Sequence, residues 1–157
     1  MRDLLRWLIF LSFFLVAVQG NAAVMVTISP SGNDVVATST GTINTGVCSV
    51  LGDVGTPGQG DSLVAPIVPQ ITFGSIGDLR TQCVSTITSP GSIGSGGLSY
   101  ANSHTGAAWQ IDFLGFDGPR NFTSNTPFNS TSTWSNSSLA SLGLNVGNYV
   151  FTLSNGG

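Results

Sequence analysis

The chain has 157 residues, of which only 7% are charged, and a formal net charge of −3. It contains four arginines, no lysine and no glutamate, so it has few cations with which to neutralise phosphates. This composition argues against a nucleic-acid partner and against anionic lipid surfaces, while a hydrophobic content of 41% excludes a disordered chain.

Residues 1–22 have the three regions of a secretory signal peptide. Arg2 and Arg6 precede an apolar run at 7–18, and small residues follow up to a predicted cut after Ala22. A helix that spans a bilayer needs roughly 20 apolar residues, so an uncleaved membrane anchor is the less favoured alternative. We therefore expect a single secreted or cell-surface domain at 23–157, with signal peptidase as its partner during export and no stable membrane anchor.

The first strands are predicted at the start of that domain. The β-branched residues Val24, Val26 and Ile28 alternate with Met25, Thr27 and Ser29. Pro30-Ser31-Gly32-Asn33 then supplies turn chemistry, and a β-branched run follows at 35–40. This order predicts a β-hairpin.

The two cysteines, Cys48 and Cys83, form the only pair that the chain offers. In an oxidising compartment one disulfide is the expected state, although two free thiols remain an alternative. A structural zinc site is not expected, because it needs four nitrogen or sulfur ligands and only His104 could add a third. No cofactor or metal is predicted.

The rest of the domain has the pattern of short strands separated by Gly, Pro, Asn and Asp. Two stretches, 52–66 and 89–97, are so rich in glycine that we expect loops there. One helical turn is predicted at 138–142, capped by Ser137 or Ser138 and ended by Gly143. The further strands are predicted at 67–73, 81–88, 108–116 and 148–153. The predicted fold class is all-β, a single antiparallel β-sandwich or jelly-roll-like domain.

Several residues are of the types found in catalytic or metal-binding sites, but their spacing does not support either role. Gly60-Asp61-Ser62-Leu63 matches the nucleophile block of the GDSL esterases and lipases, but Ala101 stands where that family has an aspartate before its catalytic histidine, and His104 has no recognisable partner. Asp53 with Asp61, or Asp112 with Asp117, could be paired carboxylates or calcium ligands. They lack the Asp-x-Asp-x-Asp-Gly spacing of a calcium loop, so turn-forming and solvated roles are favoured.

Aromatic residues gather in the last third of the chain, among Asn, Ser and Gln. Flat rings of this kind form sugar-binding platforms in exported modules, and Tyr100, Trp109 and Trp134 are the candidate contacts. A small sandwich also needs aromatic mass in its core, and Trp109 shares the period of a buried face, so core packing is favoured over a platform. The cluster comprises Tyr100, Trp109, Phe113, Phe116, Phe122, Phe128 and Trp134.

Two segments, 26–44 and 139–152, together with Gly94-Ser95-Gly96-Gly97, resemble the mature part of bacterial PEP-CTERM sorting-domain proteins. The resemblance implies an exported protein of a Gram-negative, polysaccharide-producing bacterium, handled by an exosortase and associated with the extracellular matrix. The Pro-Glu-Pro sorting tail of that family is absent, so the reading frame is expected to be truncated or divergent and the protein to be released.

The sequence thus predicts a non-enzymatic exported protein of the cell surface or extracellular matrix, with extracellular polysaccharide or other matrix components as candidate partners. A carbohydrate-binding module that uses the Trp109/Trp134 cluster is the alternative. A GDSL-type serine hydrolase is the least favoured function.

Overall fold

The computed structural model describes residues 23–53, 62–75, 79–88, 92–112, 115–119 and 121–153. The predicted signal peptide at 1–22 lies outside this part of the chain. In the described residues the strands form two antiparallel sheets, confirming the predicted all-β sandwich.

Sheet A has six strands among the described residues, in the order β7-β13-β1-β2-β12-β9. Their bounds are β1 (Ala23–Ser31), β2 (Asp34–Gly41), β7 (Ile87–Thr88), β9 (Ser103–Gly106), β12 (Phe128–Trp134) and β13 (Gly147–Leu153). The first and last of these strands along the chain are neighbours, since Ala23 pairs with Thr152. The start and the end of the domain therefore stabilise each other directly.

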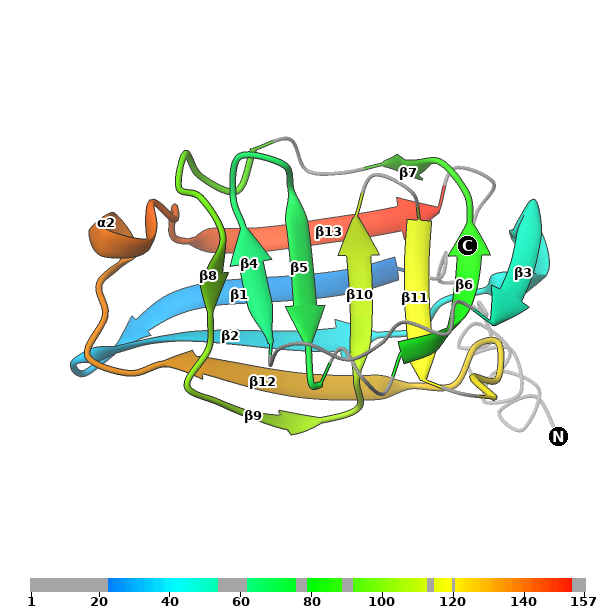
Figure 1. The fold of residues 1–157 in the computed structure, drawn as a ribbon, viewed down its shortest axis with the longest axis horizontal. Helices are drawn as coiled ribbons and strands as arrows, with labels where there is room; N and C mark the ends of the chain where they lie inside the picture. The colour runs from blue at the N-terminus through cyan, green and yellow to red at the C-terminus, as the bar shows by residue number, and fades with distance from the viewer. Residues whose placement is uncertain are drawn as a thin grey trace, which may run out of the picture.

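Sheet B has seven strands in the described part, in the order β3-β6-β11-β10-β5-β4-β8. Their bounds are β3 (Val50–Asp53), β4 (Leu63–Ala65), β5 (Gln70–Phe73), β6 (Leu79–Val84), β8 (Ser99–Tyr100), β10 (Trp109–Asp112) and β11 (Gly115–Pro119). Figure 1 shows that these strands run crosswise over those of sheet A, so the two sheets pack in the crossed rather than the aligned manner.

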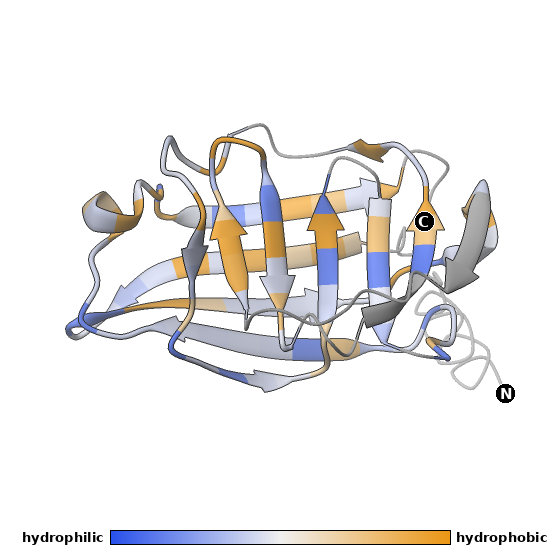
Figure 2. Ribbon diagram, in the orientation of Figure 1, coloured by the Kyte–Doolittle hydropathy of each residue, from blue (hydrophilic) through white to orange (hydrophobic). Residues whose placement is uncertain are grey.

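The core lies between the sheets and is built by alternation. Val24, Val26 and Ile28 of β1 point inward, as do Trp109 and Ile111 of β10, while the residues between them face outward. Figure 2 shows apolar segments on strands of both sheets, whereas β9 and β12 are pale or hydrophilic. Both sheets supply aromatic residues to the core, Phe73, Trp109 and Phe116 from sheet B and Phe128, Trp134, Tyr149 and Phe151 from sheet A.

The predicted hairpin is confirmed. β1 and β2 pair in register from Val24 with Gly41 to Ser31 with Asp34, joined by the two-residue turn Gly32-Asn33. Gly32 adopts φ +61°, a conformation that glycine reaches without steric cost, and this fits the short turn.

The predicted helical turn is also confirmed as α2 (Leu139–Leu142). The Ser138 hydroxyl accepts the Ser141 N–H at 3.0 Å, and the Ser141 hydroxyl accepts the Ser138 N–H at 3.0 Å. Gly143 ends the helix in the left-handed conformation. This capping box satisfies donors that a helix of one turn would otherwise leave without partners.

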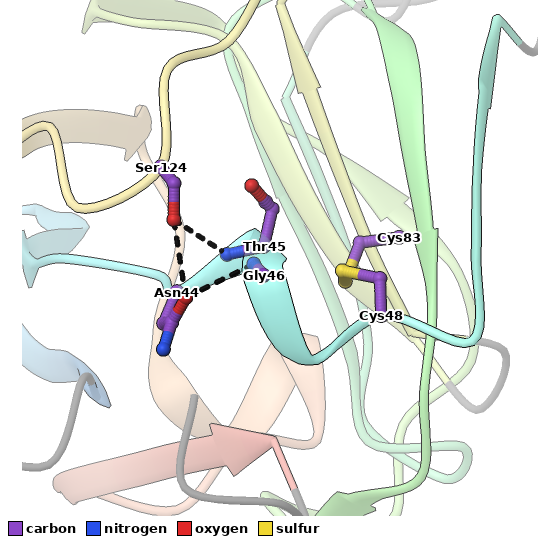
Figure 3. Close-up of a disulfide and its surroundings, with 6 residues drawn as sticks. All are labelled: Asn44, Thr45, Gly46, Cys48, Cys83 and Ser124. Carbon is purple, nitrogen blue, oxygen red and sulfur yellow. Dashed lines mark hydrogen bonds between the residues drawn. A yellow bond between two sulfur atoms is a disulfide. The ribbon is translucent and has the colours of Figure 1, made fainter.

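The disulfide Cys48–Cys83 is present, with the two Cα atoms 5.2 Å apart. It joins the end of the 3-10 turn η1 (Thr45–Val47) to a residue near the end of β6 (Figure 3). On the other side of η1, the Ser124 hydroxyl accepts the Thr45 N–H at 3.0 Å and donates to Asn44 Oδ1 at 3.2 Å. The connection from sheet A to sheet B is thus fixed from both sides.

Four expectations about segments need correction. The strand expected at 67–73 begins only at Gln70, because 66–69 form a turn. The strand expected at 81–88 divides into β6 and β7, which belong to different sheets, and the strand expected at 108–116 is the hairpin of β10 and β11. The loop expected at 52–66 is wrong at both ends, since Gly52 and Asp53 end β3 and residues 62–66 are buried around β4, while 54–61 lie outside the described residues.

The glycine-rich stretch expected as a loop at 89–97 also contributes to the core. Ile93 is fully buried, and Gly94 bridges to Leu144. An added Cβ at Gly94 would lie 2.0 Å from the Gly143 carbonyl oxygen, so glycine here permits close contact between two backbones.

Candidate ligand-binding face of sheet B

The two tryptophans proposed as a sugar platform lie in the core. Trp109 and Trp134 are each 1% exposed, so neither ring can stack on a sugar in this structure. Trp109 stacks on Phe73 with ring centroids 4.9 Å apart and donates from Nε1 to the Ser39 hydroxyl at 3.2 Å. The favoured assignment of Trp109 to the core is confirmed, and a platform made of these two rings is wrong.

Tyr100 is the one candidate sugar contact that stays at the surface. It is 51% exposed on β8, the edge strand of sheet B. Leu98, two residues earlier in the chain, is 57% exposed. Apolar and aromatic surface thus lies together at this edge.

The serine of the GDSL match is not exposed to a substrate in the described structure. Ser62 is fully buried, and its hydroxyl accepts the Gly74 N–H at 2.8 Å, which ties the start of β4 to the end of β5. His104 lies in β9 of sheet A, opposite Ser132. Gly60 and Asp61 lie outside the described residues. Ser62 therefore has a structural role in the described part of the fold.

A row of polar side chains crosses the outer face of sheet B. Strand pairing places Thr72 opposite Gln110, Gln110 opposite Asp117, and Asp117 opposite Gln82. We call these four residues the polar row. They face away from the core because each alternates along its strand with an inward residue such as Trp109, Phe116 or Cys83.

Hydrogen bonds join the polar row across its strands. The Thr72 hydroxyl donates to Gln110 Oε1 at 2.8 Å, and Gln110 Nε2 donates to Asp117 Oδ2 at 3.1 Å. The same nitrogen donates to Asp112 Oδ2 at 3.0 Å, and Asp117 also has a side-chain hydrogen bond with Gln82. Gln110 is therefore the central member, held by partners on three sides.

The row changes the proton affinity of one carboxyl group. Partial burial, and then the nearby Asp112 charge, raise the pKa of Asp117 from 3.8 to about 6, against the hydrogen bonds from Gln82 and Gln110, which lower it. Asp112 and Asp117 were expected to be turn-forming and solvated, and this is wrong. Both lie on paired strands and are half-buried, because the β10–β11 hairpin brings them to one face.

The arrangement suits binding better than bond cleavage. A glycosidase keeps the space between its two carboxylates open for the scissile bond, whereas here the Gln110 amide nitrogen lies between Asp112 and Asp117, bonded to both. Among the described residues, no group of three or more His, Cys, Asp or Glu side chains could hold a metal ion. The face presents carboxylate acceptors in fixed positions, held by the two N–H donors of the Gln110 amide.

The sequence indicated only part of this site. Alternation over 109–112 predicted that Gln110 and Asp112 share a polar face, and this is confirmed by their half-buried positions on β10. Asp117 was named as a possible partner of Asp112, and the hairpin of β10 and β11 does bring these two carboxylates to one face. Thr72 and Gln82 were missed, because they join the row through strand pairing between distant segments. Local periodicity carries no information on that register.

The outer face of sheet A has a different character. Pairing across its strands aligns Thr27, Thr38, Thr131 and Thr105 in one row, continued on β13 by Asn148, which accepts a hydrogen bond from Thr27 at 2.7 Å. This row has no charged member. The two outer faces thus provide separate surfaces whose contributions to binding can be compared by mutation.

The fold and the described side chains define a disulfide-bonded β-sandwich with an acid–amide row on one outer face. No helix in the described segments is long and apolar enough to cross a membrane. No protein-family model, no curated protein and no solved structure gives a significant match to this chain.

Proposed function

We propose that this chain is an exported, non-enzymatic protein of the cell surface or extracellular matrix that works by contact. The observation that carries the proposal is the Cys48–Cys83 disulfide, which links two distant segments, with Cys83 fully buried. Disulfides of this structural kind form and persist in oxidising compartments. The composition agrees, because a surface without lysine and with few charges must rely on hydroxyl and amide groups for solubility.

The predicted leader fits the start of the folded domain. A cut after Ala22 would leave Ala23 as the first residue of the mature chain, and Ala23 is the first residue of β1. Its carbonyl accepts the Thr42 N–H at 3.3 Å, and it pairs with Thr152 on β13. Cleavage there would remove the leader and keep the whole of the first strand.

Export is tested by expressing the full chain with a C-terminal tag in a Gram-negative host. We expect tagged protein outside the cytosol, an amino terminus at Ala23, and thiols that react with a blocking reagent only after reduction. The matched control is the same chain without residues 2–22, which should stay in the cytosol with free thiols. Recovery of cytosolic protein that retains its leader would refute the proposal.

Carbohydrate binding is the second candidate, favoured by the acid–amide row on sheet B rather than by the tryptophans. The resemblance to PEP-CTERM sorting-domain proteins stays a prediction. Sequencing the DNA that follows the codon for Gly157 tests it, because a downstream Pro-Glu-Pro segment, hydrophobic helix and basic cluster would be expected for that family.

A further inference from the structure

We propose that the outer face of sheet B binds a neutral polysaccharide, whose chain contacts the half-buried group formed by Gln110, Asp112 and Asp117 and stacks on Tyr100 at the edge. This inference rests on the proposed function, because it names the matrix component that an exported contact protein would hold.

The polar row has the side chains that recognise sugar hydroxyl groups. Each hydroxyl both donates and accepts, so planar amides and carboxylates are suitable partners. Asp112 and Asp117 each accept one hydrogen bond from Gln110 Nε2, and Asp117 also has one with Gln82. A carboxylate has about four acceptor positions, so both groups retain capacity for hydroxyl donors.

The hydrogen bonds within the row fix these groups before a ligand arrives. Gln110 is held by Thr72, Asp112 and Asp117 at 2.8–3.1 Å. A side chain that is already ordered loses less conformational entropy on binding. The row is therefore preorganised for a rigid ligand.

The edge of the sheet supplies the apolar part of the site. Tyr100 pairs with Leu63, and Leu63 pairs with Thr72, so Tyr100 lies in the same line of residues as the polar row. Pyranose rings combine an apolar C–H face with a rim of hydroxyl groups. An exposed aromatic ring in line with amides and carboxylates matches both features.

The length of the line favours a chain over a single sugar. From Tyr100 on β8 to Gln82 on β6, five steps between neighbouring strands are crossed. At about 4.8 Å per step this is roughly 24 Å. Leu63 and Thr72 are buried, so contacts concentrate at Tyr100 and at the half-buried group formed by Gln110, Asp112 and Asp117.

The charge of the face selects the class of polysaccharide. Among the side chains that the structure describes in the line and beside it, Asp112 and Asp117 are the charged groups. Two carboxylates repel a uronate-containing chain, and desolvated like charges disfavour binding strongly. Hydroxyl-rich neutral glucans meet no such penalty.

The test is binding of the mature exported protein to soluble polysaccharides by affinity electrophoresis. The probes are dextran and hydroxyethyl cellulose as neutral chains, alginate as an anionic chain and chitosan as a cationic chain. We expect retardation by at least one neutral glucan and none by alginate. No retardation by either neutral chain, or retardation by chitosan alone through simple charge, would overturn the inference.

Two variants on sheet B and one on sheet A locate the contact. Tyr100→Ala changes an exposed side chain, and Gln110→Ala removes the centre of the row, so each should weaken glucan binding roughly tenfold or more. Thr38→Ala on sheet A is the matched control and should leave binding unchanged. Urea unfolding of all three confirms the fold.

The outcomes separate this inference from the proposed function. Equal glucan binding by wild type, Tyr100→Ala and folded Gln110→Ala would refute the site, and so would a loss confined to Thr38→Ala. Export and processing at Ala23 are measured on the same protein without any polysaccharide. If the protein is processed and exported but binds no glucan, the proposed function stands and only the polysaccharide is rejected as its ligand.

Discussion

Replacing Asp117 by asparagine is expected to stabilise the protein at neutral pH. In the folded state burial and the Asp112 charge raise the pKa of Asp117 to about 6, from an ordinary value of 3.8. A difference of about two pKa units corresponds to about 3 kcal/mol. Asp117 is only half-buried, so solvent screening reduces this to on the order of 1–2 kcal/mol.

The sign follows from proton binding. A raised pKa means that the folded protein holds this proton at pH values where the unfolded chain has lost it, so stability falls as pH rises from about 4 to about 6. Above that range the ionised carboxylate destabilises the fold by the full amount. Asparagine keeps an oxygen that can accept from Gln110 and has no charge, so the variant avoids the loss.

The assay is urea unfolding of wild type and Asp117→Asn between pH 4 and pH 8. The free-energy difference between the two proteins should be close to zero near pH 4 and should reach about 1–2 kcal/mol in favour of the variant by pH 7. Taking the difference cancels the titration of the other carboxyl groups.

Asp112→Asn is the companion variant, because it removes the second cause of the shift and leaves the first. In that background the pKa of Asp117 should fall but remain above its ordinary value, and the gain from Asp117→Asn should shrink. A difference between wild type and Asp117→Asn that does not change with pH, or a variant less stable than wild type at pH 7, would show that the carboxyl group is not desolvated as the structure places it.

Three further predictions test the fold by substitution. Replacing Cys48 and Cys83 by alanine should lower the free energy of unfolding by roughly 3–4 kcal/mol, measured by denaturant titration against the disulfide-bonded wild type, because the bridge closes a separation of 35 residues. Gly143→Ala should destabilise the fold by at least about 1–2 kcal/mol, since Gly143 has φ +62°. The control is Gly97→Ala, whose added Cβ meets no atom within 4 Å, so its melting temperature should be nearly that of wild type. Ser62→Ala should cost about 1–3 kcal/mol, because the backbone N–H that donates to its hydroxyl loses its partner, with no ester hydrolysis detected before or after the change.

The success of the sequence-based prediction depended on how far each element is determined locally. The hairpin of β1 and β2 follows from alternation plus a turn of two residues, and α2 follows from a serine cap and Gly143. In both cases the residues that define the element are close in sequence. Elements of this kind can be predicted from a short segment, because their formation does not depend on residues far away in the chain.

Strand β12 shows the opposite case. Its inward residues are Phe128, Ser130, Ser132 and Trp134, so two serines interrupt the apolar period on the buried face. Ser130 is accommodated because its hydroxyl donates to the Ala107 carbonyl at 2.7 Å. That partner belongs to another segment, so a hydroxyl on the core side of a strand cannot be recognised from the strand alone.

The same dependence on distant partners governs the candidate site. Gln110 was identifiable as an outward residue, but its role comes from Thr72 and Asp117, which reach it through pairing with β5 and β11. A shift of one residue in either pairing would turn these side chains toward the core. The site is therefore a property of the sheet register.

The edge of sheet B gives a physical reason to regard Tyr100 as a contact residue. Exposed edge strands pair readily with other chains, and proteins commonly protect them with lysine or with very short strands. This chain has no lysine, and β8 is only two residues long, so strand length provides the protection. An aromatic ring and Leu98, each more than half exposed beside that edge, add apolar surface where association is already a hazard. A ligand that covers the ring would offset this hazard, and Tyr100→Ala should then lower glucan binding while leaving the unfolding midpoint within error of wild type.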